Sequence, residues 1–363
     1  MTDRKDEFLT LHEVVRAAHE RTDRGIWNYI TGGTETETTV RRNRLAFDRL
    51  AFRPRVLRDV SRIDCSARVL GRTARLPVFL APVGGLESIG QDGEILVARA
   101  ASGFGVPFYL SSVTKVGMEE VAAAAPDCPK VFQLYVRGDT DFIDDHIRRA
   151  VDSGYDAFCL TVDSAIYSRR ERDIARRFVK PWRDRAGGQD FQAALAWPEV
   201  ERIKSRHEIP LILKGIATAE DADMACRLGA DGVYVSNHGG RQLDHGRGSL
   251  DVLPEIVAAV AGRASVTVDG GICRGTDVVK AIALGANAVG IGRLYCYGLA
   301  AAGTEGVARV LELLETEIAS CLGLLGVTRF AELDPSYLCE APPVTEPHVL
   351  SAFPLISLPQ EQY

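Results

Sequence analysis

Short apolar runs alternate with amphipathic segments from about residue 77 onwards. The runs lie at 77–81, 107–111, 131–136, 157–162, 210–214, 232–236, 265–269 and 288–292. A short apolar run bounded by turn residues is typical of a buried strand, and the stretches between these runs carry helical patterns. The pattern therefore predicts eight parallel strands that alternate with helices.

The second half of the chain contains a weak internal repeat. Residues 228–233 (LGADGV) and 284–289 (LGANAV) each end a helical pattern at glycine and begin the next apolar run. Repeated βα units favour a closed barrel with an outer ring of helices. The doubly wound alternative usually shows a GxGxxG turn after a strand, and the chain has none. We therefore expect an α/β fold, a (β/α)8 TIM barrel.

Three segments lie outside the repeated pattern. Residues 9–29 have helical periodicity that ends at two glycines, which predicts an amino-terminal helical extension able to cover one barrel mouth as a lid or plug. The longest gap between strands, 164–209, follows the fourth strand and is typical of a functional loop. The tail after Ala341 holds five prolines and is predicted to be an extended arm that could pack on a neighbouring subunit. We expect one domain: extension 1–76, barrel 77–335 and arm 336–363.

Composition narrows the class of protein. At 363 residues and 46% hydrophobic content the chain can bury one large core, and its net charge of -6 argues against a nucleic-acid partner. The eight cysteines form no close CxxC pair and no Cys/His metal-ligand pattern, which predicts a reduced, metal-free protein. No apolar stretch approaches the roughly 20 residues of a membrane helix, and neither a signal segment nor a peroxisomal address is apparent. We expect a cytoplasmic protein with a small-molecule partner.

Hydrogen-bonding residues stand at the carboxyl ends of the predicted strands, the end where barrel enzymes keep their reacting groups. Strands seven and eight end in Gly-Gly (270–271) and Gly-Arg (292–293), which suits a phosphate held by backbone amides and a guanidinium. Lys214 offers a charge for an anionic ring or for Schiff-base chemistry, and Ser111, Gln133 and Thr161 could satisfy the edge of a flat heterocycle. This set fits a flavin better than pyridoxal phosphate.

The run 236–242 (SNHGGRQ) follows the sixth strand and carries the most informative chemistry. It places His238, which can take a proton near neutral pH, three residues before the fixed cation of Arg241. A base beside an anion clamp indicates chemistry on a carboxylate.

Six motifs in order resemble one family. They are FRPR (52–55), QLYV (133–136), TVD (161–163), KG (214–215), SNHGGRQLD (236–244) and DGG (269–271). Together they resemble the FMN-dependent 2-hydroxy acid oxidases and dehydrogenases, over about residues 8–335. The resemblance implies an FMN cofactor, a 2-hydroxy acid substrate, dioxygen or another electron acceptor, and a homo-oligomer, either a tetramer or an octamer.

The resemblance also implies roles for individual residues. His238 would be the catalytic base and Asp163 its orienting carboxylate, while Arg241 and Arg170 would bind the substrate carboxylate. Tyr29 and Tyr135 would complete that pocket. The flavin-contacting positions would be Pro82, Val83, Gly84, Ser111, Gln133, Thr161, Lys214, Ser236, Asp269, Gly270, Gly271, Cys273, Gly292 and Arg293, with Arg274 as an added candidate near the phosphate.

Some positions depart from the family pattern. Gly84 and Val113 stand where glycolate oxidase, a member of the family, carries alanine and tryptophan, which favours a substrate bulkier than glycolate. Cys273 replaces an arginine common near the phosphate. Residues 164–168 (SAIYS) also differ from the usual sequence.

Other interpretations of the same residues stay open. A histidine at a strand end is often structural, Asp163 could cap a helix, and Lys214 could pair with a carboxylate. Non-redox isomerase chemistry on an FMN barrel and a non-catalytic flavin-binding module are rival functions. The residues do not separate oxidase, dehydrogenase and decarboxylating monooxygenase outcomes, nor hydride transfer from a carbanion mechanism.

Overall fold

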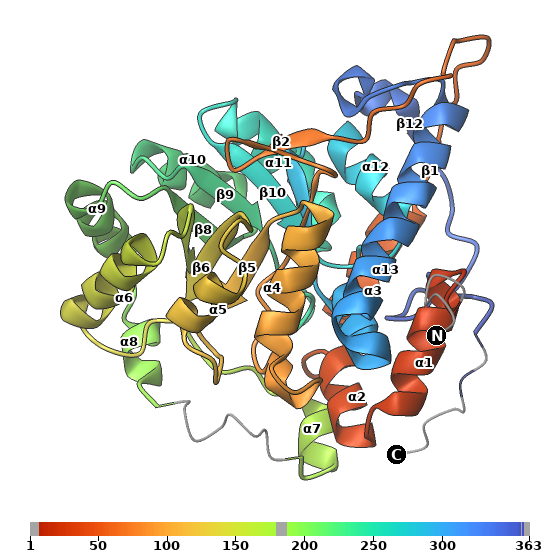
Figure 1. The fold of residues 1–363 in the computed structure, drawn as a ribbon. Helices are drawn as coiled ribbons and strands as arrows, with labels where there is room; N and C mark the ends of the chain where they lie inside the picture. The colour runs from red at the N-terminus through yellow and green to blue at the C-terminus, as the bar shows by residue number, and fades with distance from the viewer. Residues whose placement is uncertain (1–6, 179–186, 357, 359–363) are drawn as a thin grey trace.

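Eight parallel strands close into a barrel in a computed structural model that describes residues 7–178, 187–356 and 358. Each predicted run overlaps one strand, with ends that differ by up to two residues, so the (β/α)8 prediction is confirmed (Figure 1). The strands are β4 (Val78–Leu80), β5 (Phe108–Ser111), β6 (Lys130–Leu134), β7 (Ala157–Thr161), β8 (Leu211–Ile216), β9 (Gly232–Val235), β10 (Ser265–Asp269) and β11 (Ala288–Ile291).

The strand register gathers polar residues at one end of the barrel. Ser111 pairs with Gln133, and Thr161 pairs with Lys214 on the neighbouring strand. These residues end their apolar runs, so their side chains meet at the carboxyl-terminal mouth, the active face of such barrels.

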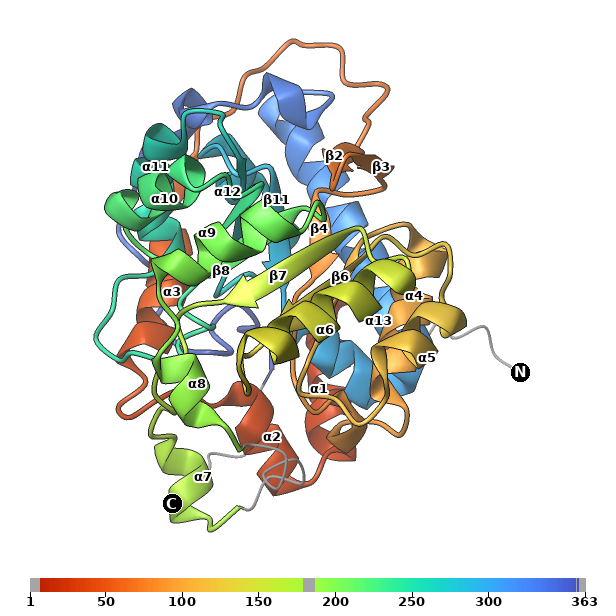
Figure 2. The ribbon, with the colours of Figure 1, turned by 90° about the vertical axis from the view of Figure 1, so that its left-hand side faces the viewer.

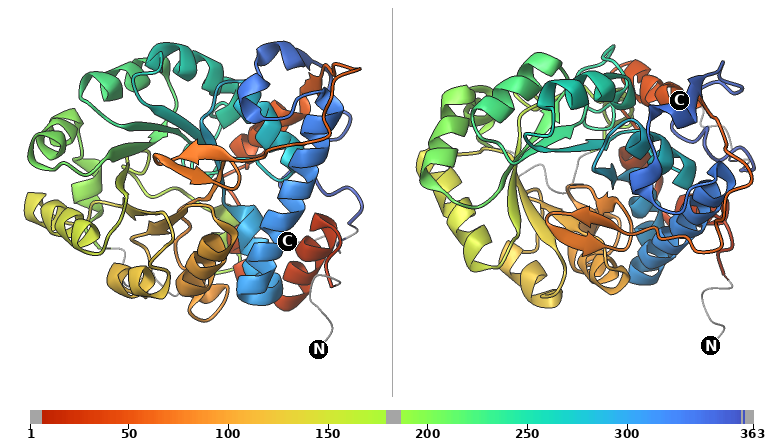
Figure 3. Two further views of the ribbon diagram at one scale, coloured as in Figure 1. Left: turned by 45° about the horizontal axis from the view of Figure 1, so that its top comes forward. Right: turned by 90° about the horizontal axis from the view of Figure 1, so that it is seen from above.

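Helices form an outer ring around the strands (Figure 3). The longest, α13, bends at Ala302 and Gly303, whose backbone angles are not helical. The ring consists of α4 (Gly93–Phe104), α5 (Met118–Ala124), α6 (Thr140–Asp152), α9 (Trp197–Arg206), α10 (Ala219–Arg227), α11 (Ser249–Val260), α12 (Gly275–Ala283) and α13 (Arg293–Leu325). Within the described residues no helix is long and apolar enough to span a bilayer.

The amino-terminal extension holds three helices: α1 (Leu11–Arg21), α2 (Arg24–Thr31) and α3 (Thr38–Asp48). Helices α1 and α2 confirm the helical pattern predicted over residues 9–29, but a break that the pattern did not show separates them. Asp23 starts the second helix by accepting hydrogen bonds from the N–H groups of Gly25 and Ile26. Helix α1 packs along α13 (Figure 1), and α2 lies at the active face.

The opposite end of the barrel is closed by a hairpin that the apolar pattern did not predict. Strands β2 (Ala67–Val69) and β3 (Arg72–Ala74) pair antiparallel, and Val69 and Ala74 pack on the aromatic side chains inside the barrel. Figure 2 shows this hairpin at the far end from α2, α7 (Glu171–Ala175) and α8 (Gln189–Ala193). The hairpin therefore closes the end of the barrel that lies opposite the active face.

The stretch between β7 and β8 is partly helical, since α7, α8 and α9 all lie within it. Shorter elements complete the fold: η2 (Leu86–Ser88), η4 (Phe330–Glu332), η5 (Pro335–Tyr337), and an antiparallel pair of β1 (Leu50–Phe52) with β12 (Leu338–Glu340).

The described part of the carboxyl-terminal arm packs on its own chain. Phe353 is 2% exposed and makes edge contacts with the rings of His12 and Tyr297. Between Ala341 and Ile356 the arm has no helix or strand, and Phe353 anchors it on α1 and α13; packing on a neighbouring subunit stays a prediction.

Candidate active site

A cavity of about 820 Å³ opens at the carboxyl-terminal ends of the strands. Its walls come from α2, α3, the loops after β4, β6 and β7, and the loops after β9, β10 and β11. Both His238 and Arg241 line it. The volume lies in the upper part of the roughly 300–1,000 Å³ typical of ligand sites, so a planar ring system and a small substrate both fit.

The loop after β9 is held in an unusual backbone conformation. His238, Gly239 and Gly240 have φ values of 60°, 62° and 75°. A Cβ on Gly240 would lie 2.7 Å from the backbone nitrogen of Val40, so only glycine fits there. Left-handed backbone at a non-glycine residue stores strain and persists only where surrounding contacts enforce it.

Those contacts come from α3, in the amino-terminal extension. The amide of Asn43 donates to Asn237 Oδ1 over 2.9 Å, and Asn237 Nδ2 donates back to Asn43 Oδ1 over 2.7 Å. Asp244 in turn accepts the N–H groups of Thr36 and Thr39 at the start of α3. The loop and the helix therefore fix one another.

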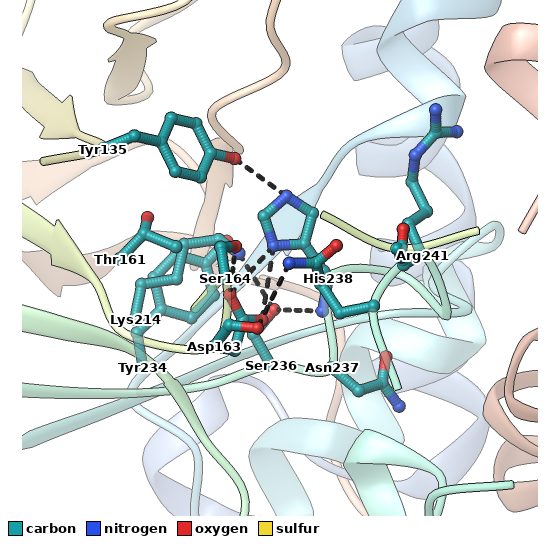
Figure 4. Close-up of polar contacts among 12 residues, drawn as sticks. Tyr135, Thr161, Asp163, Ser164, Lys214, Tyr234, Ser236, Asn237, His238 and Arg241 are labelled. Atoms are coloured by element: carbon teal, nitrogen blue, oxygen red, sulfur yellow. Dashed lines mark hydrogen bonds and ion pairs between the residues drawn. The ribbon is translucent and has the colours of Figure 1, made fainter. Parts of the chain in front are cut away.

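The His238 ring lies between a carboxylate and a phenol (Figure 4). Its Nδ1 is 3.1 Å from Asp163 Oδ1, and its Nε2 is 2.8 Å from the Tyr135 hydroxyl. An ionised carboxylate only accepts hydrogen bonds, so Nδ1 carries the ring proton and Nε2 accepts from Tyr135. The lone pair of Nε2 thus accepts the Tyr135 hydroxyl at the cavity, and a ligand hydroxyl would have to replace or share this hydrogen bond.

Burial keeps this histidine neutral. It lowers the pKa of His238 below the ordinary 6.5, and the charge of Lys214 lowers it further, against the opposing effect of Asp163. Burial alone would raise the pKa of Asp163, but His238 and Lys214 outweigh it and the pKa is lowered. At neutral pH the pair is therefore a carboxylate and a neutral imidazole that is ready to accept a proton.

Two arginines beside the histidine have no acidic partner. In the part of the chain that the structure describes, neither Arg170 nor Arg241 forms an ion pair, and Arg170 Nε and Arg241 Nη2 are buried without a hydrogen-bond partner. Burial, and then repulsion from Arg170, lowers the pKa of Arg241 to about 10. An anion placed between the two guanidiniums would remove both penalties.

Tyr29 completes this wall of the cavity from α2. Its hydroxyl donates to the Gly84 carbonyl over 3.0 Å, and the guanidinium carbon of Arg241 lies 4.6 Å from the centre of its ring. All four residues that the sequence predicted to bind substrate, Tyr29, Tyr135, Arg170 and Arg241, line the same cavity.

The model of the FMN-dependent dehydrogenase family matches residues 18–340. This chain belongs to that family. Glycolate oxidase 1 of Oryza sativa subsp. indica is 39% identical over 354 residues, covering 92% of this chain and 96% of the relative. An L-lactate oxidase of a Nostoc species is 38% identical over 356 residues, covering 91% and 98%.

Solved structures of the family superimpose closely on this barrel. An active chimera of (S)-mandelate dehydrogenase has a TM-score of 0.87 at 34% identity, covering 92% of this chain and 99% of that one. A mandelate oxidase has a TM-score of 0.85 at 39% identity, covering 93% and 100%. The protein is therefore an FMN-dependent oxidoreductase of the 2-hydroxy acid oxidase and dehydrogenase type, and its cofactor is FMN.

The polar groups at the strand ends fit the flavin ring. Lys214 lines the cavity, and its Nζ donates to Ser236 Oγ over 3.1 Å. Gln133 donates to Thr161 Oγ1 over 2.8 Å, while its own Oε1 is buried without a partner in the described residues. Lys214 suits the electron-poor edge of a flavin pyrimidine ring, and the free Gln133 acceptor, which lies at the strand ends behind the residues that line the cavity, suits an N–H group of that ring.

The predicted cofactor residues occupy two layers. Four lie at the strand ends but do not line the cavity: Ser111, Gln133, Thr161 and Ser236. Asp163 likewise lies behind His238. The remaining cofactor candidates except Arg274 line the cavity: Pro82, Val83, Gly84, Lys214, Asp269, Gly270, Gly271, Cys273, Gly292 and Arg293.

The phosphate end of the cavity is built from backbone and arginine. Helix α13 begins after Gly292 with no side-chain cap, so its first N–H groups are available to an anion. Gly270 and Gly271 have φ values of 100° and 83°, which allows the backbone to pass close to a ligand. Arg293 donates to the carbonyls of Ile30, Gly32 and Gly239, and so also joins α2 to the catalytic loop.

Arg274 does not belong to this site. Its guanidinium pairs with Glu317 and faces a separate surface pocket. This placement corrects the prediction of a phosphate contact, because as the first residue before α12 it turns outwards to the neighbouring helix α13.

Sequence reasoning missed Arg44, which lines the cavity from α3. It is 4% exposed, donates to the Gly271 carbonyl and makes a double hydrogen bond to the buried carboxylate of Asp277. It therefore fixes the glycine turn opposite α13. The signal that could have predicted its role is the adjacent pair Asn43-Arg44 among the buried residues of α3. Polar and charged side chains are rarely buried unless they have a partner, so this pair indicates a buried contact.

Proposed function

We propose that the protein oxidises an L-2-hydroxy acid to the 2-oxo acid, with His238 as the base. The observation that carries this proposal is the position of the neutral His238 Nε2, which faces the same cavity as two arginines that have no acidic partner among the described residues. Arg241 and Arg170 would bind the substrate carboxylate from two sides. The substrate hydroxyl then replaces or joins the Tyr135 hydroxyl at Nε2.

Different residues of the chain would transfer the proton, orient the substrate and stabilise the charge on the flavin. His238 takes the hydroxyl proton at Nε2, and Asp163 stabilises the imidazolium that results. Arg241 and Arg170 together form a carboxylate clamp that holds the substrate α carbon in one orientation, which lowers the entropic part of the activation barrier. FMN, when bound, supplies the electron acceptor for the α carbon, and Lys214 stabilises negative charge at its pyrimidine edge. The electrons pass on to dioxygen or another acceptor.

The wall near Gly84 supports a substrate with a large side group. Gly84 and Val113 both line the cavity and are small, and a Cβ on Gly84 would lie 2.8 Å from the Cβ of Val113, so the two residues pack directly against one another. Ile166, Tyr167 and Ile174 add apolar surface to the cavity. A cytoplasmic location and a homo-oligomeric state, tetramer or octamer, are further proposals from the sequence.

The test is anaerobic stopped-flow reduction of the bound flavin by small, aliphatic and aromatic 2-hydroxy acids, followed by reoxidation in air. We expect bleaching by at least one L-acid and none by its D-enantiomer. The rate of reoxidation in air separates an oxidase from a dehydrogenase. An FMN-loaded protein that no acid of the panel bleaches would overturn the proposal and favour non-redox isomerase chemistry on the same barrel.

A further inference from the structure

Arg137 is a cation in the cavity that the carboxylate clamp does not include. It lies two residues after Tyr135, lines the cavity and is partly buried. Its guanidinium carbon is 5.8 Å from the centre of the Tyr135 ring, and its Nη1 donates to Gln189 Oε1 over 2.8 Å. It forms no ion pair with any residue in the described ranges.

A neutral partner holds this arginine in place. The amide nitrogen of Gln189 donates to the carbonyls of Ser164 and Ala165 over 3.0 and 2.8 Å, which fixes its oxygen towards Arg137. Burial lowers the pKa of Arg137, against the opposing effect of Tyr135 and Tyr167. The arginine is thus oriented but its charge is not compensated.

Three other arginines that are buried or partly buried have a carboxylate partner, whereas Arg42 and Arg293 donate to backbone carbonyls. Arg44 pairs with Asp277, Arg172 with Glu37, and Arg202 with Asp144. A desolvated guanidinium without a carboxylate is costly, so its presence in a ligand cavity indicates an anionic group on the ligand. Arg170 and Arg241 already suffice for one carboxylate, which leaves Arg137 for a second anion.

We propose that Arg137 binds a second anionic group at the far end of the substrate, so that the preferred 2-hydroxy acid is a dianion. This inference rests on the proposed function. The Tyr135 ring contacts His238 through its hydroxyl and Arg137 along its face, so a single aromatic ring separates the base from the second cation. We therefore expect the two anionic groups of the substrate to be joined by a short carbon chain.

The test compares two acids of equal chain length, L-2-hydroxyglutarate and L-2-hydroxypentanoate, in the FMN-loaded enzyme. We expect kcat/KM for flavin reduction to favour the diacid. Arg137→Leu should lower kcat/KM for the diacid by about 10- to 100-fold, the value of a hydrogen bond to a charged group, and leave the monoacid within about twofold. Arg137→Lys should retain part of the preference, because the charge remains.

Binding is measured separately from turnover. Titration of the oxidised flavin spectrum with 2-oxoglutarate and 2-oxopentanoate should show that Arg137→Leu weakens only the diacid. Arg177→Leu is the matched control, since Arg177 also lines the cavity without an ion pair in the described residues but is exposed. We expect it to change the diacid preference far less.

The outcomes separate this inference from the proposed function. If Arg137→Leu affects both acids equally, Arg137 only positions Gln189 and the inference is wrong. An equal loss in Arg177→Leu would mean that the general positive potential, and no contact with Arg137, selects the diacid. If monoacids bleach the flavin and the diacid does not, the proposed function stands and the inference fails. If no 2-hydroxy acid bleaches it, the proposed function itself fails.

Discussion

The two ends of the barrel are built from the same strands and differ in how completely their groups are satisfied. At the hairpin end, Phe79 and Tyr109 stack with ring centres 4.4 Å apart, and Tyr234 meets both edge-on. At the open end, Arg170, Arg241 and Gln133 each keep a buried polar atom without a partner in the described structure. The tightly packed aromatic rings at the hairpin end therefore stabilise a barrel whose open end keeps buried polar atoms free to bind a ligand.

A layer of hydrogen bonds joins the two ends. The Tyr234 hydroxyl donates to Asp269 over 2.8 Å, and Ser236 Oγ donates to the same carboxylate over 2.6 Å. Ser236 Oγ also accepts from Lys214 Nζ and from the N–H of His238. The aromatic cluster of the barrel interior is therefore linked through Asp269 to Ser236, which orients both Lys214 and His238.

The largest effect should come from His238→Gln, which removes the base while glutamine still fits the loop. We expect anaerobic flavin reduction to slow by about 10²- to 10⁴-fold, the usual contribution of a positioned base, with FMN content unchanged. His245→Gln is the control, because His245 has a similar φ of 57° on the same loop but is exposed. Full activity in the His238 variant would remove its assigned role.

The second prediction concerns the stability that aromatic packing at the hairpin end of the barrel contributes. Phe79→Ala should lower the free energy of unfolding by about 3–5 kcal/mol, because Phe79 is fully buried and its loss leaves a cavity. Chemical denaturation of the FMN-loaded protein measures this value. Ile174→Ala at the open end, where Ile174 is 48% exposed, should change it by less than about 0.5 kcal/mol. Similar losses at both ends would contradict the comparison.

The third prediction concerns the close packing of Gly84 against Val113 in the cavity wall. Gly84→Ala should lower the free energy of unfolding by about 1–3 kcal/mol, measured by chemical denaturation of the FMN-loaded protein, because the new methyl group overlaps Val113. Adding Val113→Gly should restore most of the loss. Gly103→Ala, where an added Cβ meets nothing within 4 Å, is the matched control. If the double variant is no better than the single one, Val113 is not the cause.

The smallest effect is the pH dependence of the base. Because burial lowers the pKa of His238, the residue is neutral at pH 7 and its activity is lost as the pH falls through that lowered pKa. We expect the acid limb of kcat/KM to have its midpoint below 6.5. Asp163→Asn should move the midpoint lower still, since Asp163 raises the pKa of His238. A midpoint above 6.5 in the wild type would contradict the assignment.

The strands and the strand-end residues could be predicted because their information is local. An apolar run, a polar residue at its end and a glycine turn follow one another within a few positions, as in residues 232–240. What the sequence did not reveal depends on contacts between distant segments. Asp244 caps α3 from some two hundred residues away, and Arg44 is buried only because Asp277 receives it. Arg274 was misplaced for the same reason, since its partner Glu317 lies on another helix.

The reciprocal amide pair of Asn43 and Asn237 makes the amino-terminal extension an integral part of the catalytic centre. A shortened chain that begins at residue 77 would retain every barrel strand, yet the turn that carries His238 would lose its external support and could relax to an unstrained backbone. A design that places this histidine turn on another barrel would therefore also have to include α3, which lies outside the barrel strands.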